Sequence, residues 1–399
     1  MNPKFYRKVL KSGMTILFEK RENHVVSVAF AVRCGGINES LKEKGVSHFI
    51  EHLLYKGTPK RNSREIAEEI EGKGGILNGF TDETVTAYWC KIPSKHLDTA
   101  LNVLSDMVKN PLFDENEIEK ERKVIFEEIK MIKDNPPHHA FKEIQSLLYS
   151  GSLGVPLIGT EETLGSLTRE KILERFRKIY TPNNMILCVV GDADFEKITE
   201  FAEKNFSGRR GKVPKYKVIE RNSSKIEKRR GIDQANLILA YHSPTSHNKG
   251  SYAANVLNVL MAGGMSSRLF HEIREKRNLA YAIRGDSAIL RDFSYCLIYA
   301  GVKKENVALV KKLILEEFKK VSKELDEKEL SRIKEQVVGN YQISMEDSQN
   351  QMVNLLMHEI DGSAKDAYEF EKNIMNVNLA EVKKLAKIKK HSFFALVPE

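Results

Sequence analysis

A short segment that occurs twice constrains the fold of this chain more than any other feature. The sequence FDENEI at 113–118 is echoed 212 positions later by LDEKEL at 325–330. Both copies open a long helical pattern of polar and apolar residues, and Asp114 and Glu117 have the spacing of a capping box. The order of the elements around the two copies also agrees. We therefore interpret the repeat as an internal duplication of one folding unit.

The elements predicted around the repeat mix strands with helices in both halves of the chain. Apolar runs predict strands at 25–32, 85–92, 185–190 and 236–241. Helical periodicity predicts helices at 97–108, 253–261 and 307–321, and a further helix that starts after Asp114 and ends before Pro136. The 399 residues suit two or three domains, and 41% hydrophobic with 30% charged residues excludes a disordered or collagen-like chain. We expect an α+β fold with two structurally related domains.

Most of the positive charge of the chain lies in one stretch near its middle. The net charge is +9, and ten basic against two acidic residues place +8 of it between Arg209 and Arg230. Gly, Pro and Ser residues within the stretch are typical of a surface connection. We predict a basic linker at 207–230 between a first domain at 1–206 and a second domain at 231–399. Because the remainder is close to neutral and lacks a basic helix-turn-helix or an aromatic–basic pattern, we expect no nucleic-acid partner.

Two further patterns bear on the environment of the protein. No run of about 18 apolar residues is present and the first residues are charged, so we expect a cytoplasmic protein with no membrane partner. Four cysteines lie far apart, each in or beside an apolar stretch, and this indicates buried free thiols rather than a disulfide framework. They are Cys34, Cys90, Cys188 and Cys296.

The strongest candidate for chemistry is the sequence HFIEH at 48–52, within an apolar run that predicts a buried or half-buried helix. His48 and His52 are four residues apart, so on a helix they share a face and can bind one metal ion. Glu51 lies beside that face. Imidazoles and a carboxylate suit zinc, and a second carboxylate can act as a general base. Two core histidines spaced by four are the alternative, because so short a motif also arises by chance.

The predicted long helix after residue 114 supplies candidates for a third ligand. Glu121 and Glu128 are seven residues apart and flanked by apolar residues, so they lie on one face of that helix, two turns apart. Carboxylates beside an apolar face are costly unless they are paired or bound to metal. At the 212-residue offset Ile333 and Asn340 take these positions, and nothing in the second half resembles the HFIEH motif. The asymmetry indicates function in the first half and scaffold or substrate binding in the second.

These residues give the chain a resemblance to a known family. HFIEH is the inverted zinc motif of the inverzincins, and the chain resembles the pitrilysin/insulinase-type zinc metallopeptidases. It is most similar to the short two-domain branch, which includes mitochondrial processing peptidases and bacterial processing proteases. The resemblance covers essentially the whole chain. Gly79 departs from the family pattern, which usually has alanine there, and we expect little consequence.

The resemblance implies a fold and a zinc site. Each domain would contain a mixed, mostly antiparallel sheet packed with helices, and the two domains would form half of a clamshell chamber. His48, His52 and Glu128 would bind one Zn²⁺ per chain. Glu51 would be the general base, and Glu121 would be the family's additional acidic residue, supporting the site from two turns earlier.

The resemblance also implies residues that bind the substrate. Asn78 would hold the substrate backbone beside an edge strand, to which an extended peptide can add. Arg274 and Tyr281, in the second half, would hold the substrate carbonyl and stabilise the developing oxyanion. The remaining histidines have no partner spacing, and we expect His138 and His139 to be surface residues at a helix end.

The sequence thus predicts a zinc-dependent endopeptidase that hydrolyses peptide bonds in peptides or unfolded segments, with Glu51 activating the zinc-bound water. We expect a homodimer, or a heterodimer with a related subunit. The main alternative is a non-catalytic or partner subunit of a heterodimeric peptidase, or a respiratory-complex core protein. Such relatives usually lack part of the zinc motif, which is complete here. The second alternative, nucleic-acid binding through the basic stretch, has no accompanying motif.

Overall fold

The computed structural model describes residues 4–208 and 210–399, so Arg209 of the basic stretch lies outside the described residues. The chain forms two compact units, each assembled from three separate segments. Unit 1 comprises Met1–Ile129, Val155–Lys217 and Ser344–Ala367, and unit 2 comprises Lys130–Gly154, Val218–Ile343 and Tyr368–Glu399.

Unit 1 contains a six-stranded sheet in the order β1-β2-β9-β3-β7-β6. Its strands are β1 (Lys4–Val9), β2 (Thr15–Lys20), β3 (Val25–Val32), β6 (Ile76–Thr81), β7 (Thr86–Pro93) and β9 (Met185–Gly191). β2 and β9 are parallel, whereas the other neighbours are antiparallel. β9 is buried along its whole length, as expected for an apolar strand covered on both faces.

Unit 2 contains a five-stranded sheet in the order β11-β15-β12-β14-β13. Its strands are β11 (Ser224–Arg229), β12 (Ala235–His242), β13 (Ala280–Ile289), β14 (Ser294–Val302) and β15 (Ser392–Pro398). β11 and β15 are parallel and the other neighbours antiparallel. Apart from β1, the two sheets therefore have the same strand order and directions. This confirms the predicted duplication and the α+β class, with a mixed, mostly antiparallel sheet in each unit.

Helices pack against both sheets. Those of unit 1 are α1 (Val46–Leu53), α2 (Ser63–Glu71), α3 (Leu97–Lys109), α4 (Glu115–Asp134, whose last turn counts with unit 2), α6 (Glu161–Gly165), α7 (Arg169–Ile179), α8 (Phe195–Asn205) and α12 (Ser348–Asp361). Those of unit 2 are α5 (Pro136–Leu148), α9 (Gly250–Ala262), α10 (Val307–Glu324), α11 (Glu327–Met345, chiefly unit 2), α13 (Phe370–Met375) and α14 (Leu379–Leu385). The strands and helices predicted from sequence are confirmed within a few residues.

The two repeats exchange one helix. α5 packs on β12 and β15 of unit 2, whereas α12 packs on β3 and β9 of unit 1. α5 begins at Pro136 and α12 at Ser348, again 212 positions apart. In unit 1 the hydroxyl groups of Ser27 and Ser348 are 2.9 Å apart, and Arg33 donates to Glu359 at 3.0 Å. The compact units therefore differ from the sequential division at 206 and 231, because helical periodicity does not say which sheet will cover an apolar face.

The basic stretch is only partly a connection. Its residues 224–229 form β11, which pairs in parallel with β15 at one edge of the unit 2 sheet. Glu227 in this strand is 3.0 Å from Arg229 and 3.1 Å from Lys225, so charge repulsion along the stretch is partly compensated. The predicted linker at 207–230 therefore needs correction at its C-terminal end, where paired charges allow a strand to form.

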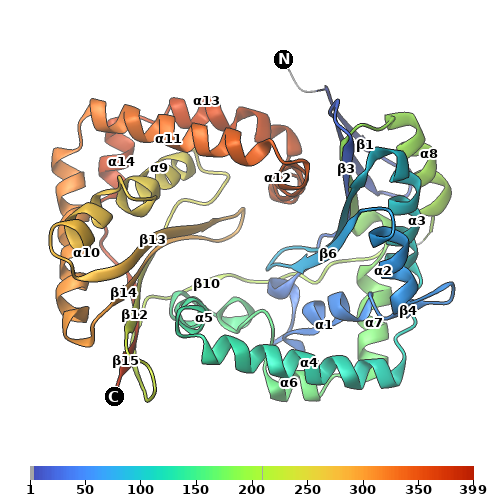
Figure 1. Ribbon diagram of the computed structural model, residues 1–399, viewed down its shortest axis with the longest axis horizontal. Helices are drawn as coiled ribbons and strands as arrows, with labels where there is room; N and C mark the ends of the chain where they lie inside the picture. Colours follow the sequence, from blue (N-terminus) through green and yellow to red (C-terminus); the bar gives the residue numbers. More distant parts are fainter. Residues whose placement is uncertain (1–3, 209) are drawn as a thin grey trace. The chain divides into compact units, whose positions relative to one another are not determined.

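The interior of each unit is apolar. All four cysteines are buried and free, as predicted. In the part of the chain that the structure describes, every helix is too short or too polar to cross a membrane. In unit 1, α1 packs against β6 and β7 and lies between β6 and α4 (Figure 1). This position brings the HFIEH motif next to an edge strand.

Candidate metal centre

Helix α1 has one face in the core and one that carries the histidines. Phe49, Ile50 and Leu53 are buried, whereas His48 and His52 are partly exposed. Glu39 fixes the start of the helix, since its carboxylate accepts hydrogen bonds from the backbone N–H groups of residues 45 and 47 at 2.9 and 2.6 Å. A carboxylate is favourable there because helix N-termini carry unpaired N–H groups.

Residue 45 needs to be glycine for the same turn. Gly45 has a φ of 96°, which favours glycine, and a β-carbon there would come within 2.6 Å of the Ile158 carbonyl oxygen. The backbone can therefore enter α1 sharply, and this orients the face that carries His48 and His52.

Helix α4 supplies the carboxylates. Asp114 accepts hydrogen bonds from the N–H groups of Asn116 and Glu117 at its start, so it caps the helix as its half of the predicted capping box requires. One turn apart on the inner face, Glu121 is 6% exposed and Ile125 is fully buried. Glu128 follows one turn later, with its side chain 35% exposed.

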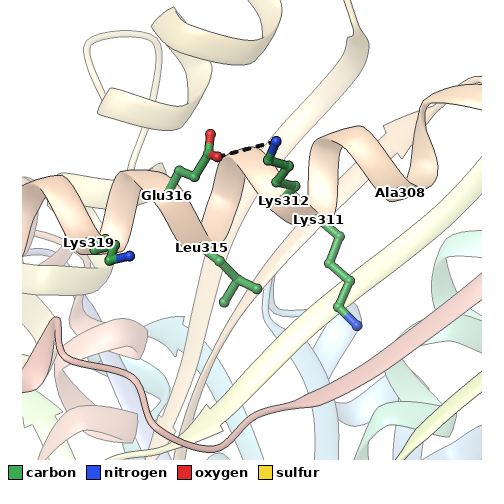
Figure 2. Close-up of a pocket in the computed structure, with 6 residues that line it drawn as sticks. All are labelled: Ala308, Lys311, Lys312, Leu315, Glu316 and Lys319. Carbon is green, nitrogen blue, oxygen red and sulfur yellow. Dashed lines mark ion pairs between the residues drawn. The ribbon is translucent and has the colours of Figure 1, made fainter.

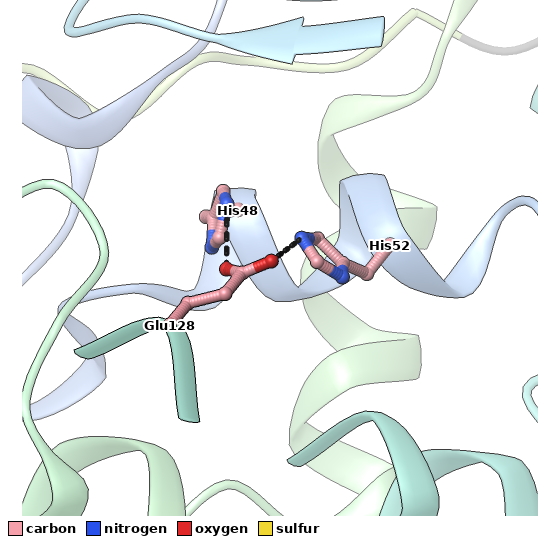
Figure 3. A group of neighbouring side chains, drawn as sticks. All are labelled: His48, His52 and Glu128. Atoms are coloured by element: carbon pink, nitrogen blue, oxygen red, sulfur yellow. Dashed lines mark ion pairs between the residues drawn. The ribbon is translucent and has the colours of Figure 1, made fainter. Parts of the chain in front are cut away.

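The Glu128 carboxylate faces both imidazoles (Figure 3). Its Oε2 lies 3.8 Å from His48 Nε2, and its Oε1 lies 3.6 Å from His52 Nε2. One ligand atom from each of the three residues lies within 4.8 Å of the others. Two N or O ligands of one zinc ion, each about 2.0–2.2 Å from it, are less than about 4.4 Å apart. The separations of 3.8 and 3.6 Å between the Glu128 oxygens and the two imidazole nitrogens are within this limit.

The protonation of His48 also fits a metal ion. Burial, reinforced by the charge of His52, lowers the pKa of His48 to about 3. His48 is therefore neutral at physiological pH, the form in which imidazole binds metal. Its Nδ1 is buried and has no hydrogen-bond partner among the described residues. Two imidazoles and a carboxylate are a donor set that zinc prefers, so the residues present fit this metal.

Glu121 orients His52. Its Oε2 accepts a hydrogen bond from His52 Nδ1 at 3.2 Å, and its Oε1 is 2.6 Å from Lys56 Nζ. When Nδ1 carries the proton, Nε2 has a free lone pair directed at Glu128. Carboxylates that hold a ligating histidine in this way fix its tautomer and raise its basicity. Lys56 was not assigned a role from sequence, because nothing in a residue pattern shows that it pairs with a helix 65 positions away.

Glu51 lies beside the group but is more buried. It is 9% exposed, and burial raises its pKa to about 7, a rise that the charge of His52 opposes and that of Glu128 increases. Its carboxylate reaches β6, next to the group of ligands. A β-carbon at Gly79 in β6 would lie 2.9 Å from its Oε1. Glu51 is therefore placed next to the metal group without being part of it.

The space at Gly79 corrects an expectation. Glycine in place of the family's usual alanine was expected to have little consequence, but in this chain a β-carbon at residue 79 would also clash with the Tyr55 hydroxyl oxygen. Atoms that close must move apart. Sequence reasoning also missed Tyr55, although it follows Glu51 by four residues, the spacing that brings two side chains onto one helical face.

Asn78 lies in β6, at the edge of the unit 1 sheet. It is opposite Trp89 of β7, and its side-chain oxygen accepts a hydrogen bond from the N–H of Gly79 at 2.8 Å. Within residues 4–208 and 210–399, the outer side of β6 has no partner strand. An edge strand of this kind can pair with an extended peptide.

Arg274 and Tyr281 belong to unit 2. Arg274 lies on a π-helical turn at Phe270–Glu275, with its guanidinium 4.7 Å from the centre of the Phe270 ring. Tyr281 is in β13 and is 52% exposed. Both side chains are described with unit 2, so their role in binding substrate stays a prediction.

A second group of possible ligands lies in unit 2, formed by His139, Glu143 and Glu227. His139 is buried, contrary to the expected surface position, because its Nε2 is 3.0 Å from Glu227 on β11. Lys225 binds Glu143 at 2.7 Å, and Arg229 binds Glu227 at 3.0 Å. These cations already neutralise the carboxylates, so we interpret this group as an ion-pair cluster.

A hollow on α10 of unit 2 has a lining that differs from the group of possible metal ligands in unit 1 (Figure 2). It is lined by Ala308, Lys311, Lys312, Leu315, Glu316 and Lys319. Lys312 and Glu316 are 3.7 Å apart, as expected for an exposed pair one turn apart on a helix. With lysines as its main polar groups, this lining does not resemble the imidazole and carboxylate group of unit 1.

Comparison with known proteins agrees with the geometry of the site. Residues 15–161 match the insulinase domain of peptidase family M16, and residues 166–337 match the peptidase M16 inactive domain. An uncharacterized zinc protease of Rickettsia felis is 35% identical over 353 residues, 87% of this chain and 85% of that protein. The uncharacterized zinc protease YmxG of Bacillus subtilis is 32% identical over 387 residues, 96% of this chain and 94% of that protein. The crystal structure of a protease from Helicobacter pylori has a TM-score of 0.93 at 22% identity, covering 99% of this chain and 100% of that one.

Proposed function

Because the chain belongs to the insulinase-type peptidase family M16, we propose that it is a zinc-dependent endopeptidase that hydrolyses peptide bonds in peptides or unfolded segments. The observation that carries the proposal is the approach of Glu128 to both His48 and His52, at 3.8 and 3.6 Å. A non-catalytic relative has no need to keep a carboxylate against two imidazoles.

His48, His52 and Glu128 would hold one zinc ion per chain. When bound, zinc supplies Lewis acidity, which makes water a nucleophile at neutral pH and polarises a carbonyl group. Glu121 keeps His52 in the tautomer with a free Nε2, and Lys56 in turn binds Glu121. Lys56 thus holds Glu121, and Glu121 in turn holds His52 in the orientation that metal binding needs.

Glu51 acts as general base and then as general acid. Its carboxylate takes a proton from the attacking water and delivers it to the amine that leaves when the peptide bond breaks. The edge of β6 receives the extended substrate, with Asn78 holding its backbone. Arg274 and Tyr281 of unit 2 hold the substrate carbonyl oxygen and stabilise its negative charge. Edge pairing requires an extended chain, which favours peptides and unfolded segments as substrates.

The decisive experiment compares zinc content and cleavage of an unfolded peptide in three proteins. Wild type should bind zinc and cleave, and Glu51→Gln should bind zinc without cleaving. Glu115→Gln, an exposed glutamate in the first turn of α4, is the matched control and should behave as wild type. Cleavage by Glu51→Gln at the wild-type rate would remove Glu51 as the base and contradict the mechanism.

We further propose that the active assembly is a homodimer, with a heterodimer of related subunits as the alternative. Sedimentation of the purified chain together with its peptidase activity tests this. An active dimer supports the homodimer. A zinc-loaded but inactive chain that gains activity only with a related subunit supports the partner-subunit alternative, and full activity in a monomer would contradict both.

A further inference from the structure

Gly79 leaves a space that two neighbouring side chains share. A β-carbon at residue 79 would lie 2.4 Å from the Tyr55 hydroxyl oxygen and 2.9 Å from Glu51 Oε1, and the Ala87 carbonyl oxygen is also 2.9 Å from that point. The φ of Gly79 is not in the left-handed region, so its backbone would accept other residues. The requirement for glycine here is steric, because a β-carbon would occupy the space that the phenol and the carboxylate border.

The Tyr55 hydroxyl needs a hydrogen-bond acceptor. Its oxygen is buried and has no partner among the described residues. A buried hydroxyl without a partner costs free energy, so the group is expected to bond to an acceptor within reach. Of the two oxygens at the shared space, the Ala87 carbonyl belongs to the backbone of the β6–β7 pairing, where Ala87 lies opposite Phe80. The Glu51 carboxylate, with two oxygens and several lone pairs, is the acceptor with capacity to spare.

Packing limits where the phenol can go. The Tyr55 ring centre is 6.1 Å from that of Tyr88, which is fully buried. The hydroxyl groups of Tyr88 and Tyr180 are 2.7 Å apart and satisfy each other. Tyr55 thus lies beside an anchored ring, which limits where its own ring can move.

We propose that Tyr55 is a positioning residue for Glu51: its hydroxyl donates a hydrogen bond to the Glu51 carboxylate and holds it in a single orientation, in the space that Gly79 leaves. Tyr55 itself transfers no proton and acts through Glu51. Its catalytic consequence rests on the proposed peptidase function, whereas the hydrogen bond and the shared space do not.

Two double-mutant cycles in thermal unfolding test the geometry without using activity. Gly79→Ala should lower the unfolding midpoint by several degrees, and Tyr55→Phe combined with it should recover most of the loss, because the closest atom has been removed. Tyr6→Phe in β1, at the opposite edge of the same sheet, is the matched control and should add to Gly79→Ala independently. In the second cycle, Tyr55→Phe and Glu51→Ala should be non-additive, as expected for two ends of one hydrogen bond. Additive effects in both cycles would overturn the proposal.

Steady-state kinetics test the positioning role. Tyr55→Phe should lower kcat about tenfold, with KM within about twofold and zinc content unchanged, because a misoriented base slows the proton transfer without weakening substrate binding. A wild-type kcat in Tyr55→Phe would refute positioning. If the wild-type protein binds zinc but cleaves no peptide, the proposed function fails, while the two unfolding cycles still decide whether Tyr55 bonds to Glu51.

Discussion

The same helix in the two repeats shows what the fold needs and what the site adds. α4 and α11 begin 212 positions apart, and Glu121 in α4 corresponds to Ile333 in α11. Glu121 is 6% exposed and Ile333 is 0% exposed, so equivalent buried positions hold a carboxylate and an isoleucine. Isoleucine satisfies core packing directly, whereas the carboxylate is tolerated because His52 and Lys56 bind it. The fold therefore does not require Glu121, and its presence in one repeat marks the site.

The two groups of possible metal ligands, two histidines with one glutamate in unit 1 and one histidine with two glutamates in unit 2, support the same conclusion. In unit 2, Lys225 and Arg229 bind the carboxylates of the cluster around His139. In unit 1, and within the described part of the chain, Glu128 has only imidazole partners in its ion pairs. The presence of nearby cationic side chains thus distinguishes a structural ion-pair cluster from a group that can accept a metal ion.

Removal of a ligand should have the largest effect. Glu128→Ala should abolish cleavage and lower zinc affinity by about a thousandfold or more, since roughly 10–16 kcal/mol of zinc binding is shared among a few ligands. Asn340→Ala, the equivalent and exposed position in α11, is the control and should leave both unchanged. Isothermal titration with zinc and a peptide assay measure the difference. Equal losses of zinc affinity and cleavage at residues 128 and 340 would contradict the assignment of the metal site to one repeat only.

The next effect concerns stability. Ile333→Glu places in α11 the carboxylate found in α4, but without a His52 or a Lys56 to bind it. A buried charge without a partner should destabilise the protein by about 3–5 kcal/mol, measured by urea unfolding. Ile333→Val, which keeps the position apolar, should cost only about 0.5–1.5 kcal/mol. Tolerance of glutamate at 333 would show that the burial of Glu121 carries no information about the site.

A smaller effect is expected from Glu121→Gln. The amide is nearly isosteric but loses the charge that Lys56 and His52 bind, and partners of ligating histidines typically contribute 10–100-fold to metal affinity. We expect zinc affinity to fall within that range while the unfolding midpoint of the metal-free protein changes little. Loss of a thousandfold or more would instead make Glu121 a ligand, equal in rank to Glu128.

The smallest effect concerns the pH dependence of stability, which tests whether the group around His139 in unit 2 is an ion-pair cluster. Partial burial raises the pKa of Glu227, but hydrogen bonds from His139, Lys225 and Arg229 outweigh it and hold the pKa at about 2, below the ordinary 4.5. A lowered folded pKa stabilises the protein above the unfolded pKa, and this stabilisation is lost as the pH falls from about 4.5 to 2. Glu227→Gln should therefore cost about 1 kcal/mol at pH 7 and progressively less in acid, with zinc content unchanged. Loss of bound zinc in this variant would contradict the assignment of an ion-pair cluster.

The comparison of repeats also shows what residue patterns could predict. The segment after Asp114, its echo 212 positions later and the spacing of His48 and His52 were sufficient to predict the duplication, the α+β class and a metal-binding face on α1. These features are local or periodic: a cap, an apolar stripe and an i, i+4 pair depend on residues close in sequence. The same holds for β3 and β9, whose apolar runs predicted buried strands.

Tertiary structure alone decided the rest. It exchanged α5 and α12 between the two sheets, turned residues 224–229 into an edge strand and brought Tyr55 and Glu51 together over Gly79. Each of these depends on which surfaces meet when segments far apart in sequence pack, and on steric and charge neighbours that no spacing records. Thus the residues that can hold zinc were evident from the sequence by itself. The contacts of Glu121 with His52, and the space at Gly79 beside Glu51, were decided by packing.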